Sequence, residues 1–375
     1  MKYYIIAGEA SGDLHGSNLI KALIAEDPEA QVRFWGGGKM LAAGGVMVRD
    51  YKDTAIMGVA EILGSLGKIR KNLSFCKSDI LEWAPDVVIL IDYPGFNMKI
   101  AKFCHSAGIK VFYYIAPKTW ASREGRNRKL REWVDKLFIV FPFEVPYFES
   151  RGIPFIYKGN PLVDAIDGFS YSRESLPSGQ YIAILPGSRK GEIARTLPGA
   201  MAMADSLHAL PQYRDCRFVV AGAPARSEED YREIIGGRDY VSLVFDRTYD
   251  VLKYALAAMV NSGTASLEAA LIGTPQVVCW STSKFNAFIG QHILHVLDHI
   301  KYISLGNLIL DKLAFRELIQ YYFTPEAVSA EIRRLIEDIP YREEMLSDYA
   351  EIRRRLGGSG ASGAVARAMI EELKG

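Results

Sequence analysis

The stretch that decides the fold is residues 87–97, which read VVILIDYPGFN. Its five leading apolar residues are typical of a strand buried on both faces, as in a parallel sheet covered by helices. Asp92 follows at once, and Pro94-Gly95 then break the strand before a helical pattern that starts near Asn97. Parallel sheets bind ligands at the carboxyl ends of their strands, so Asp92 is either a site residue or a cap of the turn.

Strand and helix patterns alternate along the whole chain, which predicts a parallel α/β architecture. A softer stretch, rich in Gly, Ser and Pro, occupies residues 164–180 and is interpreted as a linker between two sheets. Two sheets joined in this way are expected to form a cleft that binds a small molecule. The expected strands lie near residues 2–7, 31–35, 46–49, 86–91, 110–115, 137–141 and 153–157, and then near 181–185, 216–221, 241–244, 257–260 and 275–279.

The composition is that of a soluble globular protein, with 49% hydrophobic and 24% charged residues in 375. The net charge of +1 creates no field that would attract nucleic acid, so no nucleic-acid partner is predicted. The four cysteines are far apart, without a CxxC pair, and are expected to be reduced and buried. No uncharged apolar run is long enough to span a bilayer, so any membrane contact is expected to be peripheral.

The first loop, Gly8–Gly16, lacks the spacing of a dinucleotide-binding fingerprint. Because no acid ends the second strand either, no nicotinamide or other cofactor is predicted. Gly8 lets a ligand approach the backbone closely, and Glu9 and Ser11 would then line the cleft. The alternative is a tight turn that is capped by Asp13.

Two loops in the second half are suited to a nucleotide. Leu185–Arg189 ends a strand before a helix, so the amides of Gly187, Ser188 and Arg189 and the guanidinium of Arg189 are predicted to converge on a diphosphate. Asn261–Glu268 opens another helix, and its residues Ser262, Gly263 and Thr264 offer hydroxyls and helix-end N–H groups to an anion. Glu268 lies one turn further and is placed to accept both hydroxyls of a ribose, although it could also be a solvated helix residue.

Two further patterns concern a membrane and a metal. Residues 61–83 mix apolar and basic side chains, which suits either a helix on an anionic membrane or an ordinary helix with a solvated basic face. No metal is predicted, since His292, His295 and His299 lack the acid of a HExxH arrangement. The candidate membrane patch consists of Leu66, Lys68, Ile69, Arg70, Lys71 and Leu73.

From about residue 3 to 373, the chain contains short segments whose order along the sequence resembles that of the lipid A disaccharide synthase family. The combination is far more specific than any single loop. The matching segments are Gly8–Asp13 (GEASGD), Met57-Gly58 with Glu61, Ile91–Asn97 (IDYPGFN), Pro142–Glu144, Leu185–Arg189 with Glu192, Ser262–Glu268 (SGTASLE), Ile303–Leu308 (ISLGNL) and Gly357–Ser362 (GGSGAS).

The resemblance implies an inverting glycosyltransferase of the GT-B type, with two Rossmann-like domains at residues 1–167 and 178–356 and residues 357–375 crossing back to the first. It implies transfer of 2,3-diacylglucosamine from its UDP derivative to the 6-hydroxyl of 2,3-diacylglucosamine 1-phosphate (lipid X), a step of lipopolysaccharide synthesis in Gram-negative bacteria. Such an enzyme would be cytoplasmic and peripheral on the inner face of the inner membrane, which favours the membrane reading of residues 61–77.

Residue roles carry over from the matching segments. Asp92 would be the general base, with Glu9 beside it, and Ser11, Met57, Glu61 and Asn97 would contact the sugars or the acceptor. The UDP portion would be held by Gly187, Ser188, Arg189, Ser262, Gly263, Thr264, Glu268 and Asn307.

This chain departs from the family pattern at several positions. Asn160 stands where the family commonly has His, residues 117–123 differ from the usual segment, and Gly306 replaces a proline before Asn307. Residues 311–312 are Asp-Lys where Gly-Arg is common. These departures concern the acceptor contacts and acyl preference more than the reaction type. The alternatives are another GT-B enzyme acting on UDP-N-acetylglucosamine, either a lipid-linked transferase or a 2-epimerase, and a non-catalytic nucleotide-sugar-binding module.

Overall fold

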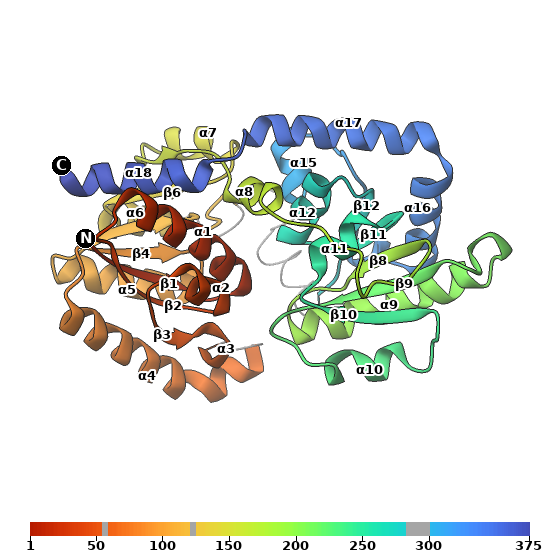
Figure 1. Cartoon of the computed structure of the whole chain (residues 1–375), viewed down its shortest axis with the longest axis horizontal. Coiled ribbons are helices and arrows are strands. Elements are labelled where there is room, and N and C mark those ends of the chain that lie inside the picture. The colour runs from red at the N-terminus through yellow and green to blue at the C-terminus, as the bar shows by residue number, and fades with distance from the viewer. Residues whose placement is uncertain (55–58, 121–124, 283–300) are drawn as a thin grey trace. The chain divides into compact units, whose positions relative to one another are not determined.

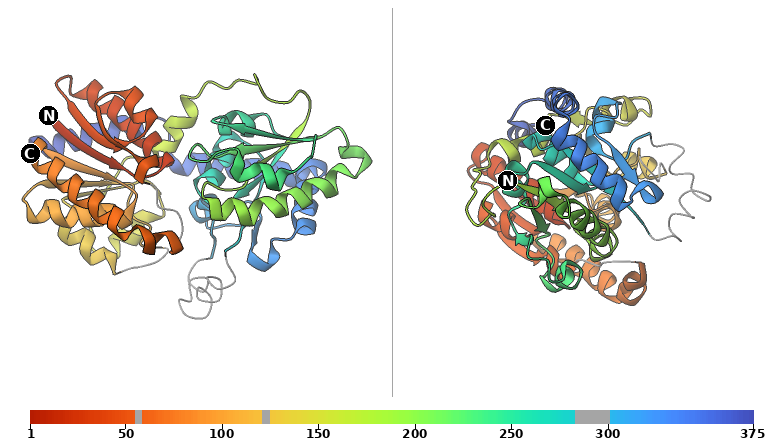
Figure 2. Two further views of the ribbon diagram at one scale, coloured as in Figure 1. Left: turned by 90° about the horizontal axis from the view of Figure 1, so that it is seen from below. Right: turned by 90° about the vertical axis from the view of Figure 1, so that its right-hand side faces the viewer.

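The computed structural model describes residues 1–54, 59–120, 125–282 and 301–375, with the backbone alone at 54 and 59–66. The chain divides into two compact units, which are unit 1 (Met1–Asp167 with Leu356–Gly375) and unit 2 (Gly168–Arg355) (Figure 1). Each unit contains one parallel sheet with helices on its faces, which confirms the predicted α/β fold class (Figure 2).

The sheet of unit 1 has the strand order β3-β2-β1-β4-β5-β6-β7. Its strands are β1 (Lys2–Ala7), β2 (Gln31–Gly36), β3 (Val46–Asp50), β4 (Val87–Ile91), β5 (Lys110–Tyr114), β6 (Lys136–Ile139) and β7 (Ile156–Tyr157). Its helices are α1 (Ala10–Glu26), α2 (Gly38–Ala43), α3 (Tyr51–Thr54), α4 (Val59–Trp83), α5 (Pro94–Ser106), α6 (Arg126–Trp133), α7 (Glu144–Glu149), α8 (Pro161–Asp167) and α18 (Ala361–Lys374). Residues 164–167, which the sequence assigned to the linker, therefore end a helix.

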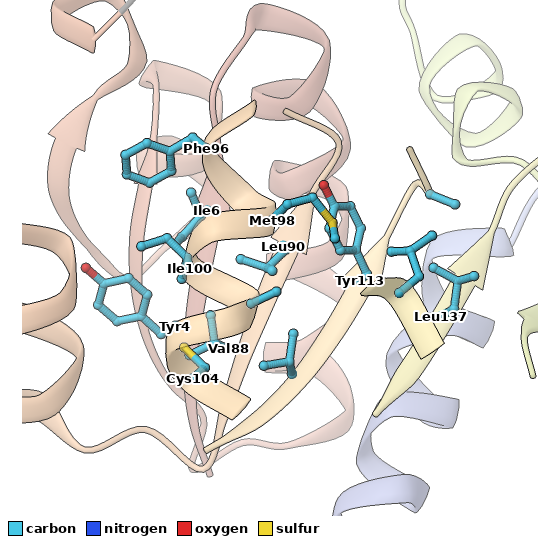
Figure 3. Close-up of a cluster of buried hydrophobic side chains, with 14 of the residues drawn as sticks. Tyr4, Ile6, Val88, Leu90, Phe96, Met98, Ile100, Cys104, Tyr113 and Leu137 are labelled. Atoms are coloured by element: carbon cyan, nitrogen blue, oxygen red, sulfur yellow. The ribbon is translucent and has the colours of Figure 1, made fainter. Parts of the chain in front are cut away.

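Strand β4 lies at the centre of this sheet, and all five of its residues are completely buried. Successive side chains of a strand point to opposite faces, so a strand that is covered on both sides must be apolar throughout. One face packs against α5 and forms the core cluster of Figure 3, in which α5 contributes Phe96, Ile100 and Cys104. The strands contribute the alternate residues Tyr4, Ile6, Val88, Leu90, Val111, Tyr113, Leu137 and Ile139.

The sheet of unit 2 has the order β10-β9-β8-β11-β12-β13. Its strands are β8 (Tyr181–Leu185), β9 (Arg217–Gly222), β10 (Val241–Phe245), β11 (Ala257–Asn261), β12 (Gln276–Trp280) and β13 (Glu317–Ile319), of which β13 was not predicted. Its helices are α9 (Lys190–His208), η1 (Pro211–Tyr213), α10 (Glu229–Ile235), α11 (Thr248–Lys253), α12 (Thr264–Ile272), α15 (Leu305–Leu310), η2 (Gln320–Tyr322), α16 (Pro325–Glu337) and α17 (Ile339–Leu356).

The last helix, α18, belongs to unit 1 and packs against α1 and α8, which confirms that the C-terminus returns to the N-terminal domain (Figure 1). Asp164 of α8 caps its start, because the Asp164 carboxylate accepts hydrogen bonds from the N–H groups of Gly360 at 2.6 Å and Ser362 at 2.7 Å. A carboxylate at a helix N-terminus satisfies otherwise unpaired amides and interacts favourably with the helix dipole. The glycine-rich segment before α18 is thus tied to unit 1 by a specific contact.

Candidate functional site

In unit 1 the strand order reverses between β1 and β4, and this is where open parallel sheets bind ligands. The two strands run side by side, with Ala7 opposite Ile91. Glu9 therefore follows one strand and Asp92 follows the other, at the same edge of the sheet. Glu9 is exposed and Asp92 is half-buried, so a carboxylate from each strand lies at the switch point.

The backbone turns sharply where β4 ends. Asp92 and Tyr93 have φ angles of 43° and 46°, two consecutive left-handed residues without a glycine. Such conformations are unfavourable for residues that carry a Cβ, and they cluster at functional sites. The sequence predicted the position of Asp92 but not this backbone conformation.

Gly8 and Tyr93 are in close contact across the same edge. A Cβ built on Gly8 would lie 2.3 Å from the Tyr93 ring, so only glycine fits beneath it. Burial and, second, the charge of Glu9 raise the pKa of Tyr93, which indicates that Glu9 lies close to this ring. The ring also stacks on Phe96 of α5 at 5.6 Å between centroids. The loops after β1 and β4 are thus packed as one body.

Two residues of the matching segments in unit 1 have structural roles. The buried carboxylate of Asp13 accepts hydrogen bonds from Gly37 N at 2.8 Å and Met40 N at 3.0 Å, so it caps α2 rather than its own turn. Asn97 is completely buried, and its amide donates to the Asp92 carbonyl at 2.9 Å and the Ile91 carbonyl at 3.2 Å. These bonds hold the main chain where β4 ends, and the predicted contact of Asn97 with the acceptor stays a prediction. Ser11, in contrast, is half-exposed at the start of α1.

Unit 2 has its own switch point, between β8 and β11. The loops that follow these two strands are the ones that the sequence predicted to bind a nucleotide. The Arg189 side chain is 58% exposed and its Nη1 lies 3.1 Å from Oε1 of Glu192. The amides of Ser188 and Arg189 donate to Oε2 of Glu192 at 3.0 and 3.2 Å. The Glu192 carboxylate therefore binds two of the amides that the sequence predicted for a diphosphate, and their binding to a diphosphate stays a prediction.

Helix α12 starts at Thr264, separated from the end of β11 by two residues, without a hydrogen bond from a side-chain cap. Gly263 and Thr264 are half-buried at this start, and the Ser262 hydroxyl donates to the Ile303 carbonyl at 3.4 Å. Helix N-termini carry partial positive charge and unpaired N–H groups, a favourable setting for an anion. Glu268, one turn further, is half-buried and accepts a hydrogen bond from Tyr249 Oη at 3.1 Å.

Asn307 makes several hydrogen bonds within unit 2. It is completely buried, its Nδ2 donates to the Phe315 carbonyl at 3.0 Å and to Glu317 Oε1 at 2.8 Å, and its Oδ1 accepts from Ala314 N at 2.9 Å. These bonds tie α15 to β13, and the predicted contact of Asn307 with UDP stays a prediction. Glu317 also accepts from the amides of Ile303 and Ser304, both at 3.0 Å, so it organises the segment before α15.

Several predicted residues cannot be placed. Met57 and the three histidines at 292, 295 and 299 lie outside the described residues, as do the side chains of Glu61 and Leu66. Among the candidate membrane residues that are described, Lys68, Arg70 and Lys71 are exposed and Ile69 is half-buried. Leu73 is half-buried and packs against the core of unit 1, and its predicted contact with lipid stays a prediction.

Glu144, at the start of α7, is a buried acid in unit 1 whose pKa is strongly shifted. It is 1% exposed, and its Oε2 accepts from the amides of Val140 and Phe141 at 3.1 and 3.0 Å. Burial raises the pKa of Glu144 from 4.5 to about 7, although these hydrogen bonds oppose the shift. The folded state thus binds this proton more tightly than the unfolded state does. The contribution of the proton to the free energy of unfolding is therefore complete below pH 4.5 and is lost as the pH rises through 7.

We therefore expect Glu144→Gln, which stays neutral and can still accept both hydrogen bonds, to be more stable than the wild type at pH 8 by about 3 kcal/mol at most. At pH 4 the two proteins should be nearly equal, because the wild-type carboxyl is then largely protonated in both the folded and the unfolded state. Chemical denaturation of the full chain at both pH values measures the difference. The control is Glu149→Gln on the exposed end of α7, which should change neither value. A Glu144→Gln effect of the same size at both pH values would contradict the raised pKa of Glu144.

Comparison with known proteins relates the whole chain to one family. Residues 3–362 match the model of the family described as lipid-A-disaccharide synthetase. The lipid-A-disaccharide synthase of Geobacter metallireducens is 38% identical over 376 residues, which cover 98% of this chain and 96% of that protein. Two solved structures share the fold at low identity. One is S. aureus MnaA in a co-structure with UDP (TM-score 0.70, 14% identity, 100% of this chain and 97% of that chain). The other is the glycotransferase of kitacinnamycin (TM-score 0.62, 16% identity, 99% of this chain and 98% of that chain).

Proposed function

Because the chain belongs to the lipid-A-disaccharide synthetase family, and is therefore a glycosyltransferase, we propose that it joins UDP-2,3-diacylglucosamine to 2,3-diacylglucosamine 1-phosphate (lipid X). The products are a β-1,6-linked disaccharide phosphate and UDP, with inversion at the anomeric carbon. The observation that carries the proposal is the Asp92 carboxylate at the switch point of unit 1, in a chain that matches this family over nearly its whole length.

Asp92 acts as the general base in this proposal. The 6-hydroxyl of lipid X is a primary alcohol and a weak nucleophile, so a carboxylate must take its proton while the oxygen bonds to the anomeric carbon. Asp92 suits this task because it is half-buried, at an edge where parallel sheets receive ligands. Glu9 follows the neighbouring strand, and with Ser11 it binds sugar hydroxyls beside the reacting one.

Unit 2 holds the UDP portion in this proposal. The bond from the anomeric carbon to the diphosphate breaks during transfer, so negative charge grows on UDP as it leaves. The exposed guanidinium of Arg189 and the uncapped start of α12 at Gly263 and Thr264 offer positive charge to it. Glu268 binds the ribose hydroxyls. Fold similarity to a protein solved with UDP is consistent with this assignment.

The proposal is tested by supplying UDP-2,3-diacylglucosamine and lipid X together and looking for the disaccharide phosphate and UDP. We expect one UDP for each disaccharide, and no product when lipid X is omitted. UDP-N-acetylglucosamine should not replace the acylated donor. Turnover with UDP-N-acetylglucosamine alone, giving its 2-epimer, would instead support the epimerase alternative. Binding of UDP without turnover of either donor would support the non-catalytic alternative.

We also propose that the protein acts in the cytoplasm, peripherally on the inner face of the inner membrane, since both substrates carry acyl chains. Within the described part of the chain, every helix is too short or too polar to span a bilayer. Lys68, Arg70 and Lys71 are exposed together on α4, and exposed basic residues attract anionic lipid headgroups. Phe75 on the same helix is 41% exposed and adds an apolar side chain near them.

Changing Lys68, Arg70 and Lys71 to Glu should weaken binding to phosphatidylglycerol vesicles at least tenfold, because about 1 kcal/mol is lost for each basic residue near an anionic surface. Vesicle sedimentation at two salt concentrations measures the effect, which should shrink at high salt. The control makes the same change in charge elsewhere in unit 1, at the exposed residues Lys21, Lys39 and Lys99. Equal weakening by both triple variants would show that the charge alone matters, and not its place on α4.

A further inference from the structure

The end of β4 adopts a conformation that the surrounding protein has to hold. Asp92 and Tyr93 are left-handed in succession, at φ angles of 43° and 46°, and neither is a glycine. A residue with a Cβ prefers other conformations, so such a pair persists only where its neighbours impose it. The direction of the Asp92 side chain depends on this backbone, because φ and ψ at a residue set the direction of its Cα–Cβ bond.

The carbonyl oxygen of Asp92 accepts two side-chain hydrogen bonds. Tyr113 Oη, at the end of β5, donates to it at 2.6 Å, and Asn97 Nδ2, on α5, donates to it at 2.9 Å. Both donors are completely buried, and Asp92 N in turn donates to the Tyr114 carbonyl at 3.2 Å. The peptide group after Asp92 is therefore fixed from a neighbouring strand and from the following helix.

Tyr113 is well suited to act as the fixed donor. Burial raises the pKa of Tyr113 far above its usual value, so the hydroxyl keeps its proton throughout the pH range in which the protein is folded. Its ring belongs to the core cluster of unit 1, which leaves the hydroxyl little freedom to move (Figure 3). Asn97 makes its other bonds to main-chain carbonyls of Ile91 and Ile6, so it follows the sheet.

We propose that Tyr113 is a positioning residue for the transfer reaction, which, together with Asn97, holds the main chain at Asp92 so that the carboxylate meets the acceptor hydroxyl. This inference rests on the proposed role of Asp92 as the base. Tyr113 does not take part in the chemistry itself. Its effect is on the placement of another group, and an error of about 1 Å in such a placement is enough to slow a reaction greatly.

The test is Tyr113→Phe, which removes the hydroxyl and keeps the ring. We expect kcat to fall about tenfold, the loss for one hydrogen bond of ordinary strength, while KM for lipid X stays within a factor of two. The matched control is Tyr114→Phe, the next residue on β5, which is also completely buried but has its hydroxyl beside Ser362. Its kcat should stay at the wild-type value. Thermal unfolding and UDP affinity, measured on all variants, check that each is folded.

A double-mutant cycle separates positioning from a general structural role. In an Asp92→Asn background, Tyr113→Phe should cause no further loss of the residual rate, because the group that it positions is already inactive. A kcat within twofold of the wild type, a tenfold loss that persists in the Asp92→Asn background, or an equal loss in Tyr114→Phe would each overturn the inference. If Tyr113→Phe does not fold, Asn97→Ser removes the second donor and enters the same cycle with the same expected outcome.

The cycle also distinguishes this inference from the proposed function. If Asp92→Asn alone keeps the wild-type rate, Asp92 is not the base, and the proposed mechanism fails with the inference. If Asp92→Asn is inactive, only the positioning role fails when Tyr113→Phe leaves kcat unchanged or causes the same loss in the Asp92→Asn background.

Discussion

Asp92→Asn is expected to lower kcat by roughly 10²–10⁴, the usual contribution of a general base, while UDP still binds. The amide has nearly the same shape as the carboxylate but cannot accept the proton of the acceptor hydroxyl. Because the UDP contacts are proposed to lie in unit 2, the dissociation constant for UDP should stay within twofold of the wild type. Initial rates of disaccharide formation and calorimetric titration with UDP measure the two quantities.

The matched control for this variant is Asp246→Asn. Asp246 also follows a parallel strand, β10, and also has a left-handed backbone, with φ at 57°. It is exposed at the edge strand of the other unit, away from the switch point between β8 and β11. Its amide variant should keep the wild-type rate. An Asp92→Asn rate above about a tenth of the wild type would contradict the assignment of the base.

Gly8→Ala is expected to have the second-largest effect, because the added Cβ would lie 2.3 Å from the Tyr93 ring. The ring must move, and Tyr93 follows Asp92 directly in the left-handed pair. A shift of this kind displaces the carboxylate, so we expect kcat to fall on the order of 100-fold. Overpacking should also lower the free energy of unfolding by about 1–3 kcal/mol. Rate measurements and chemical denaturation follow the two effects separately.

Gly95→Ala is the control for this prediction. Gly95 lies in the same segment, two residues after Tyr93, and a Cβ built on it meets no atom within 4 Å. Its rate and stability should match the wild type. A smaller side chain in place of Tyr93, as in Tyr93→Ala, should restore part of the stability in the Gly8→Ala background. If it restores none, the contact between Gly8 and Tyr93 is not the cause of the loss.

The strands could largely be predicted from local patterns. Runs such as Val87–Ile91 and Tyr181–Leu185 are apolar throughout, and a strand buried on both faces needs no information from distant residues to be recognised. Strand β13 escaped prediction because its three residues, Glu317–Ile319, carry no such pattern. It forms only because β12 offers an edge to pair with, through the register of Val278 with Glu317. A short strand of this kind is a tertiary feature.

Polar residues in the matching segments were harder to assign. Asp92, Asn97 and Asn307 look alike in a sequence, since each is a polar residue in a recognisable segment. Only Asp92 keeps some exposure, whereas the two asparagines are completely buried and bind main-chain carbonyls. Glu192 carried a signal that could have been used, because an acid three residues after a helix N-cap commonly accepts hydrogen bonds from the amides there. Tyr113 and Tyr249 carried no such signal, since the residues that accept their hydrogen bonds are distant in the chain.

By itself, the sequence determined the alternation of strands and helices and the family, and it indicated the loops in which functional residues are predicted to lie. These depend on short-range patterns of apolar, small and polar residues, which are written in the order of the chain. The tertiary structure alone decided which strands are neighbours, and so which loops meet at the switch points between β1 and β4 and between β8 and β11. It also decided which polar groups are buried, because burial depends on segments that come from far along the chain, as when Tyr113 of β5 holds the carbonyl of Asp92.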